Sequence, residues 1–189
     1  MTLSALLLAG GESRRMGRDK ATMEVGGEPL WKRQLKVLRA LGPEKMFVSA
    51  RTAPAWLPDH VALLLDDPPS RGPLSGLAKA LASMETTHVD ALAVDMPFIT
   101  VGELQRLLEH VTEECGAVPI MDERVEPLAA IYPTEARADF QNALEGADFS
   151  LQSLVRKLVA KERMKLWPIL KGNERFYKSV NEPSDFELE

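Results

Sequence analysis

The amino-acid sequence predicts an α/β fold, a three-layer α/β/α sandwich with a mostly parallel central sheet. Two observations support this prediction. Short, continuously apolar runs alternate with amphipathic helical segments, and several of these runs end in glycine or aspartate. A parallel strand reads as apolar throughout because helices cover both of its faces. With 189 residues, the chain can bury one core, and we expect residues 1–189 to form a single domain.

The first half of the chain carries the strand–helix alternation. Strands are expected over 3–9, 45–50, 61–65 and 89–95. Helices are expected over 29–41, 72–84 and 100–110. The last of these begins with the spacing of a capping box, Thr100 followed by Glu103. Right-handed crossovers through such helices would make the strands parallel.

The pattern changes after residue 115. The segments 116–121 and 125–133 predict strands joined by a polar turn, which suits an antiparallel pair. Helices are expected over 134–146 and 151–160, and further strands over 164–169 and 176–181. The sequence has no repeats and no linker-like stretch.

Composition narrows the function classes. A net charge of −5 disfavours bulk nucleic-acid binding. One cysteine and three histidines lack the spacing of a zinc site. No segment approaches the roughly 20 apolar residues of a membrane span, and the start does not read as a signal peptide. We therefore expect a cytoplasmic protein with no nucleic-acid and no membrane partner.

The stretch "LLLAGGESRRMGRDK" (6–20) predicts a phosphate-binding loop, because a buried strand runs into glycines and then into four cations. Its spacing fits neither a Walker A loop nor a dinucleotide-binding fingerprint. Two other strands end in Asp66-Asp67 and in Asp95. In parallel sheets the carboxyl ends of strands share one edge, where ligands bind. The sequence therefore predicts that these residues meet at one site.

The segments "LLLAGGESRRMGRDKATMEVGGEPLW", "LLLDDPPSRGPLSGL", "ALAVDMPFIT", "EPLAAIYP" and "FYKSVNEPSDF" occur in this order. Together they resemble the nucleotidyltransferases with a Rossmann-like, glycosyltransferase-A-like fold. Within that superfamily, the form of the first segment most resembles the molybdenum cofactor guanylyltransferase (MobA) family. The resemblance implies an Mg²⁺-dependent enzyme that transfers GMP from GTP to the terminal phosphate of the molybdenum–molybdopterin cofactor and releases pyrophosphate.

The same resemblance implies roles for individual residues. The GTP-binding set would be Leu8, Ala9, Gly10, Gly11, Lys20, Asp66 and Asp95. The catalytic set would be Arg15, Lys20 and Asp95, and the Mg²⁺ ligands Asp95 and Asn181. Arg71 and Glu126 are suggested for the acceptor. Ser49 departs from the family, because that strand often ends in an asparagine that contacts the nucleotide.

Other readings stay open. The protein could be a molybdopterin cytidylyltransferase or another sugar-phosphate nucleotidyltransferase, although the "LAGG" segment favours guanine over cytosine. A nucleotide-binding module without catalysis is the third reading, disfavoured by the joint presence of Arg15, Lys20, Asp95 and Asn181. As partners we expect GTP and molybdenum–molybdopterin, with transient contacts to cofactor-biosynthesis or acceptor proteins. The protein is expected to be a monomer or a weak homo-oligomer.

Overall fold

A central eight-stranded sheet organises the chain in the computed structural model, which describes residues 1–10 and 19–180. The strand order is β10-β7-β9-β6-β1-β4-β5, with β8 paired to β7. The strands are β1 (Leu3–Leu8), β4 (Lys45–Ala50), β5 (Ala62–Leu65), β6 (His88–Ala93), β7 (Gly116–Met121), β8 (Arg124–Val125), β9 (Ala129–Pro133) and β10 (Met164–Pro168).

Most of the sheet is parallel. β1 runs parallel to both β4 and β6, β4 runs parallel to β5, and β7 runs parallel to β10. β9 is antiparallel to its neighbours β6 and β7, and β8 is antiparallel to β7. The carboxyl ends of β1, β4, β5, β6, β7 and β10 therefore lie along one edge of the sheet. The predicted fold class is confirmed.

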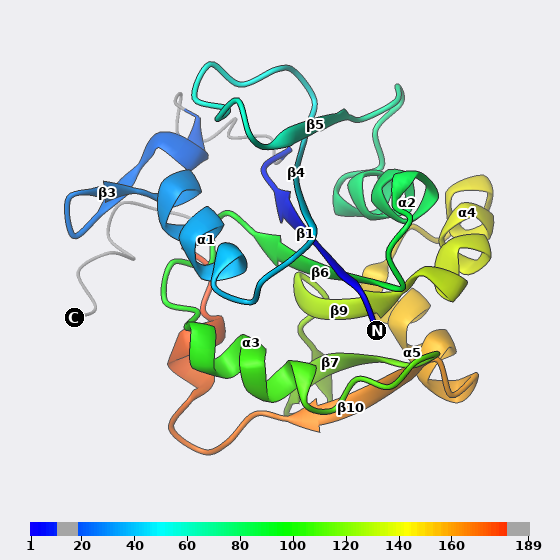
Figure 1. Cartoon of the computed structure of the whole chain (residues 1–189). Helices are drawn as coiled ribbons and strands as arrows, with labels where there is room; N and C mark the ends of the chain where they lie inside the picture. Colours follow the sequence, from blue (N-terminus) through cyan, green and yellow to red (C-terminus); the bar gives the residue numbers. More distant parts are fainter. Residues whose placement is uncertain (11–18, 181–189) are drawn as a thin grey trace.

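Helices cover both faces of the sheet (Figure 1). On one face, α1 (Leu30–Arg39) and α3 (Val101–Leu108) pack through Leu35, Leu38 and Leu104. On the other, α2 (Pro73–Ser83), α4 (Arg137–Glu145) and α5 (Leu151–Ala160) pack through leucines and Phe140. β1 lies between these layers, so all six of its residues are buried. Two covered faces explain why its sequence is apolar throughout.

Two expected strands differ from the structure. The segment 125–133 is broken, because residues 126–128 lie between β8 and β9 without strand pairing of their own. Of the strand expected over 176–181, residues 176–180 form no strand: Glu174–Tyr177 form the 3₁₀ helix η3, and residues 178–180 continue as irregular chain, while residue 181 lies outside the described residues. Tyr177 and Val180 are nevertheless buried, three positions apart and outside the sheet.

Smaller differences concern element ends. The helix expected over 134–146 begins with a 3₁₀ turn, η2 (Thr134–Ala136), before α4. A two-stranded hairpin of β2 (Glu24–Val25) and β3 (Glu28–Pro29) was not predicted. The sequence signal for this hairpin was the pair Gly26-Gly27. In the structure both glycines have positive φ, +59° and +77°, as a two-residue hairpin turn requires.

No helix within residues 1–10 and 19–180 is long and apolar enough to cross a membrane.

Candidate active site

The strand ends that the sequence singled out meet at the carboxyl edge of the sheet. Hydrogen bonds extend the ladders past the strands: Ala9 N donates to Ser49 O at 2.9 Å, and Val94 N donates to Leu8 O at 3.0 Å. Asp66 N donates to Ala50 O at 3.0 Å. The chain adds β4 and β5 on one side of β1 and then places β6 on its other side. The direction in which strands are added therefore reverses at β1. Ligands of open α/β sheets bind at such points.

Asp66 is held in a fixed orientation beside Gly10. Its two carboxylate oxygens accept hydrogen bonds from Ser49 Oγ at 3.0 Å and Ser70 Oγ at 2.9 Å. A Cβ atom on Gly10 would lie 3.4 Å from the Asp66 carboxylate. Gly10 therefore lies directly beside the Asp66 carboxylate, and a methyl group there would be at van der Waals distance from it.

Ser49 has a different environment from that of a nucleotide-contacting side chain. It is 2% exposed, and its hydroxyl donates to Asp66. Gly76 of α2 makes room for it, because a Cβ there would lie 2.3 Å from Ser49 Oγ. Ser49 is therefore a buried residue that orients the Asp66 carboxylate.

Lys20 and Asp95 form the second charged feature. Lys20 Nζ lies 2.9 Å from Asp95 Oδ2, and both side chains remain partly exposed, at 18% and 25%. The 3₁₀ helix η1 (Lys20–Thr22) places the lysine, and Asp19 caps that helix by accepting from Ala21 N. Asp19 also accepts from Trp56 Nε1 at 2.8 Å, which ties the loop to the body of the protein.

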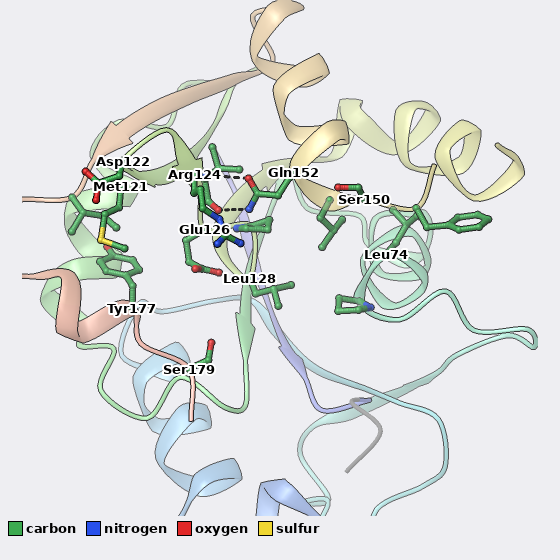
Figure 2. Close-up of a pocket in the computed structure, with 16 residues that line it drawn as sticks. Leu74, Met121, Asp122, Arg124, Glu126, Leu128, Ser150, Gln152, Tyr177 and Ser179 are labelled. Carbon is green, nitrogen blue, oxygen red and sulfur yellow. Dashed lines mark hydrogen bonds between the residues drawn. The ribbon is translucent and has the colours of Figure 1, made fainter. Parts of the chain in front are cut away.

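A cavity of about 610 Å³ is lined in part by Glu126, Tyr177 and Ser179 (Figure 2). Its walls come from α2, the β7–β8 turn, residues 126–128, the start of α5 and the segment after β10. They include Leu74, Met121, Arg124, Glu126, Leu128, Phe149, Gln152, Tyr177 and Ser179.

Two contacts fix the polar wall of this cavity. The Gln152 side chain donates to Val125 O at 2.6 Å and accepts from Val125 N at 3.2 Å, so it holds β8 in place.

Burial raises the pKa of Glu126, and the nearby negative charge of Asp95 adds to that rise. Glu126 and Asp95 are therefore close enough to interact electrostatically, although they belong to separate segments.

The predicted site residues divide into three groups. Leu8, Ala9, Gly10, Asp66, Lys20 and Asp95 lie at one edge of the sheet, as predicted. Glu126 lines the cavity, whereas the guanidinium of Arg71 lies over the ring of Phe149, 4.3 Å from its centre. Gly11, Arg15 and Asn181 lie outside the described residues.

Sequence reasoning missed Tyr177, Ser179 and Gln152 as parts of the site. Tyr177 and Ser179 fell within an expected strand, which obscured them. Gln152 is one of several polar residues on an amphipathic helix, and nothing in its local sequence marks it.

Among residues 1–10 and 19–180 no three His, Cys, Asp or Glu side chains cluster to hold a metal ion.

Sequence comparisons identify relatives of this chain. Residues 5–163 match the model of the MobA-like NTP transferase domain. A protein of Opitutus terrae named "Probable molybdenum cofactor guanylyltransferase" is 35% identical over 190 residues, covering 99% of this chain and 94% of that protein.

Solved structures share the fold. Molybdopterin-guanine dinucleotide biosynthesis protein A from Archaeoglobus fulgidus superposes with a TM-score of 0.72 at 19% identity, covering 97% of this chain and 95% of the other. The 2-C-methyl-D-erythritol 4-phosphate cytidylyltransferase from Thermus thermophilus gives a TM-score of 0.69 at 19% identity, with the same coverage of 97% and 95%. At these identities the likeness concerns the fold alone. From the match of residues 5–163, the chain belongs to the MobA-like NTP transferase family.

Proposed function

We propose that the protein is a molybdenum cofactor guanylyltransferase: it transfers GMP from GTP to the terminal phosphate of the molybdenum–molybdopterin cofactor and releases pyrophosphate. The observation that carries this proposal is the position of the Lys20–Asp95 pair. Asp95 follows β6 beside the end of β1, where Val94 N donates to Leu8 O at 3.0 Å. Its backbone oxygen accepts from Val180 N at 2.8 Å, and the same segment supplies Tyr177 and Ser179 to the wall of a cavity of about 610 Å³. Two substrates could meet there across a cation and a carboxylate. The name of the Opitutus terrae relative supports guanylyl transfer.

The GTP side is the edge formed by Leu8, Ala9, Gly10 and Asp66. Backbone groups at the end of β1 would contact the base, and Gly10 allows the close approach that a side chain would block. Asp66 is pre-oriented by two serine hydroxyls, so its carboxylate is available to accept hydrogen bonds from base or ribose. Gly11 would complete this subsite.

The chemistry requires charge neutralisation more than proton transfer. An oxygen of the acceptor phosphate attacks the α-phosphorus of GTP, and the bond to the bridging oxygen of pyrophosphate breaks. An acceptor phosphate is already anionic at neutral pH, with a second pKa near ~6, so no general base is needed. Lys20 and Arg15 would neutralise the triphosphate, and a lysine held at the edge of the site needs little reorganisation to do so.

Asp95 and Asn181 would hold Mg²⁺. Oxygen ligands suit this ion, which is commonly bound by one or two carboxylates with substrate phosphates completing its shell. The Asp95 carboxylate fits that description, because it follows the end of β6 and is partly exposed. When bound, Mg²⁺ would supply stabilisation of the charge that develops on the phosphate oxygens.

The cavity would take the acceptor. Burial favours the protonated form of Glu126 up to a higher pH than for an exposed glutamate, and a protonated carboxyl can donate a hydrogen bond to an anionic ligand. The proposal also places the protein in the cytoplasm, as a monomer or weak homo-oligomer that makes transient contacts with cofactor-biosynthesis or acceptor proteins.

A donor-exchange assay tests the function. The protein is incubated with Mg²⁺, molybdenum–molybdopterin and each nucleoside triphosphate in turn, and pyrophosphate release is measured. Release with GTP only is expected. Release with CTP only would identify a cytidylyltransferase instead, and nucleotide binding without any turnover would identify a non-catalytic module.

The Asp95→Ala variant tests the assignment of the metal ligand. We expect loss of turnover by at least about 10³-fold, because removing a group that stabilises transition-state charge costs roughly 10²–10³ or more in rate. Asp67→Ala is the matched control, since Asp67 lies next to the site residue Asp66 but is 83% exposed and pairs with Lys79. Near-normal activity of Asp95→Ala with a normal unfolding temperature would contradict the assignment.

A further inference from the structure

We propose that Glu103 of α3 is a positioning residue for the acceptor side of the active site. Glu103 does not reach the site itself. It acts by anchoring residues 169–180, here called the C-terminal strap, which carry Tyr177 and Ser179 into the wall of the cavity. The consequence for acceptor binding rests on the proposed function of that cavity.

The strap crosses the carboxyl edge of the sheet and is fixed at both ends. At its start, Ile169 N donates to Ile120 O of β7 at 3.0 Å. At its end, Val180 N donates to Asp95 O at 2.8 Å. In Figure 1 the strap runs from β10 past α3, with its short helix η3 beside that helix. Its position therefore sets one wall of the cavity and one contact to the backbone of Asp95.

Glu103 is the anchor between these two ends. Its carboxylate accepts from Asn173 Nδ2 at 2.8 Å through one oxygen and from the Tyr177 hydroxyl at 3.2 Å through the other. Arg106 also donates to it from the next turn of α3. Glu103 is 1% exposed although it is charged. A buried carboxylate is stabilised only by such donors, so the strap and the carboxylate depend on each other.

The contacts of the Glu103 side chain differ from those that its position in the capping-box spacing predicts. Thr100 caps α3 as expected, accepting from Glu103 N at 3.3 Å. In a capping box the glutamate side chain would return to the backbone of Thr100. Here both carboxylate oxygens are engaged by the strap, which lies 70 and 74 residues further along the chain. Helix stability alone does not account for this arrangement.

Two residues of the strap line the cavity that is proposed for the acceptor. Tyr177 and Ser179 line the cavity together with Glu126 (Figure 2). Burial and the neighbouring Glu103 charge raise the pKa of Tyr177, so its hydroxyl keeps its proton and acts as a donor to Glu103. On the GTP side, the hydrogen bonds of Asp66 come from Ser49 and Ser70 and not from the strap. The strap meets Asp95 of the proposed GTP set through the backbone, by the hydrogen bond from Val180 N to Asp95 O.

The test is the kinetics of Glu103→Gln. Glutamine offers one acceptor oxygen to three donors, so at least one contact to the strap or to Arg106 weakens. We expect the KM for the acceptor to rise at least about 5-fold, while the KM for GTP stays within about 2-fold. Tyr177→Phe, which removes only the hydroxyl, should raise the acceptor KM in the same way, and the double variant should be less than additive.

Thr100→Ala is the matched control. It weakens the same helix by removing its cap but leaves the strap contacts in place, so both KM values should stay at the wild-type level. If Glu103→Gln and Thr100→Ala give the same kinetics, or if the GTP and acceptor KM values rise together, Glu103 has only a structural role and the inference is wrong.

Hydrogen exchange provides a readout that does not depend on the reaction. In Glu103→Gln the amides of residues 173–180 should exchange at least about 5-fold faster than in wild type, while those of β1 and α2 should not change. Unchanged exchange in the strap would overturn the anchor. Absence of turnover in the wild-type enzyme would instead overturn the proposed function and leave the exchange result to decide the anchor.

Discussion

Asp90 gives the protein a pH-dependent stability that a single substitution should remove. It lies in β6, between Ala5 of β1 and Ile131 of β9, and is fully buried. Neither of its carboxylate oxygens has a hydrogen-bond partner in the described structure. Burial raises the pKa of this carboxyl from 3.8 to about 7, with no charged neighbour contributing. The folded protein therefore holds Asp90 in its neutral form below pH 7.

The sign follows from comparing the two states. Between pH 4 and pH 7 the unfolded chain has an ionised Asp90 and the folded chain a protonated one, so folding takes up a proton. The free energy of unfolding then falls as pH rises and levels off above pH 7. Each unit of pH between the two pKa values is worth about 1.36 kcal/mol, which gives a total loss of about 4 kcal/mol.

Asp90→Asn removes this titration while keeping the shape of the side chain. The difference in the free energy of unfolding between the variant and wild type should shift in favour of the variant by about 3 kcal/mol from pH 5 to pH 8. Urea unfolding at pH 5, 6, 7 and 8 measures the difference. Asp59→Asn, at an exposed carboxyl, is the control and should run parallel to wild type over the same range.

The reasoning would be refuted by a difference between Asp90→Asn and wild type that does not change between pH 5 and pH 8. Such a constant difference would show that the buried carboxyl is ionised in the folded protein throughout this range.

Three further predictions concern the site. Asp66→Ala should raise the KM for GTP by about 10-fold or more, as expected for a hydrogen bond to a charged group, whereas the exposed Asp67→Ala should leave it unchanged; initial rates at varied GTP check this. Gly76→Ala should lower the free energy of unfolding by about 1–3 kcal/mol through overpacking against Ser49, and a wild-type melting temperature would contradict the close contact. Gln152→Ala releases two hydrogen bonds to β8 and should raise the KM for the acceptor more than that for GTP; an equal rise in both would show a general loss of structure.

Much of the fold could be predicted from local sequence, because the pattern of each segment follows from which of its faces are covered. The run 3–9 is apolar throughout since β1 has helices on both sides. The sequence also placed Gly10, Asp66 and Asp95 at one edge, because strand ends in a parallel sheet share an edge whatever the details of packing. The strand expected over 176–181 is wrong for residues 176–180, because Tyr177 and Val180 are buried from a 3₁₀ helix and irregular chain, and burial alone does not specify strand pairing.

The sequence by itself determined the fold class, the family resemblance and the edge of the sheet at which the chemistry would occur. These depend on local periodicity and on the order of strands and helices. Only the tertiary structure decided that Lys20 pairs with Asp95, that Ser49 orients Asp66, and that Glu103 holds Tyr177. Each pair joins residues 17 to 75 positions apart. Such contacts arise from how the crossovers and the strap pack across the sheet, and no local pattern specifies that packing.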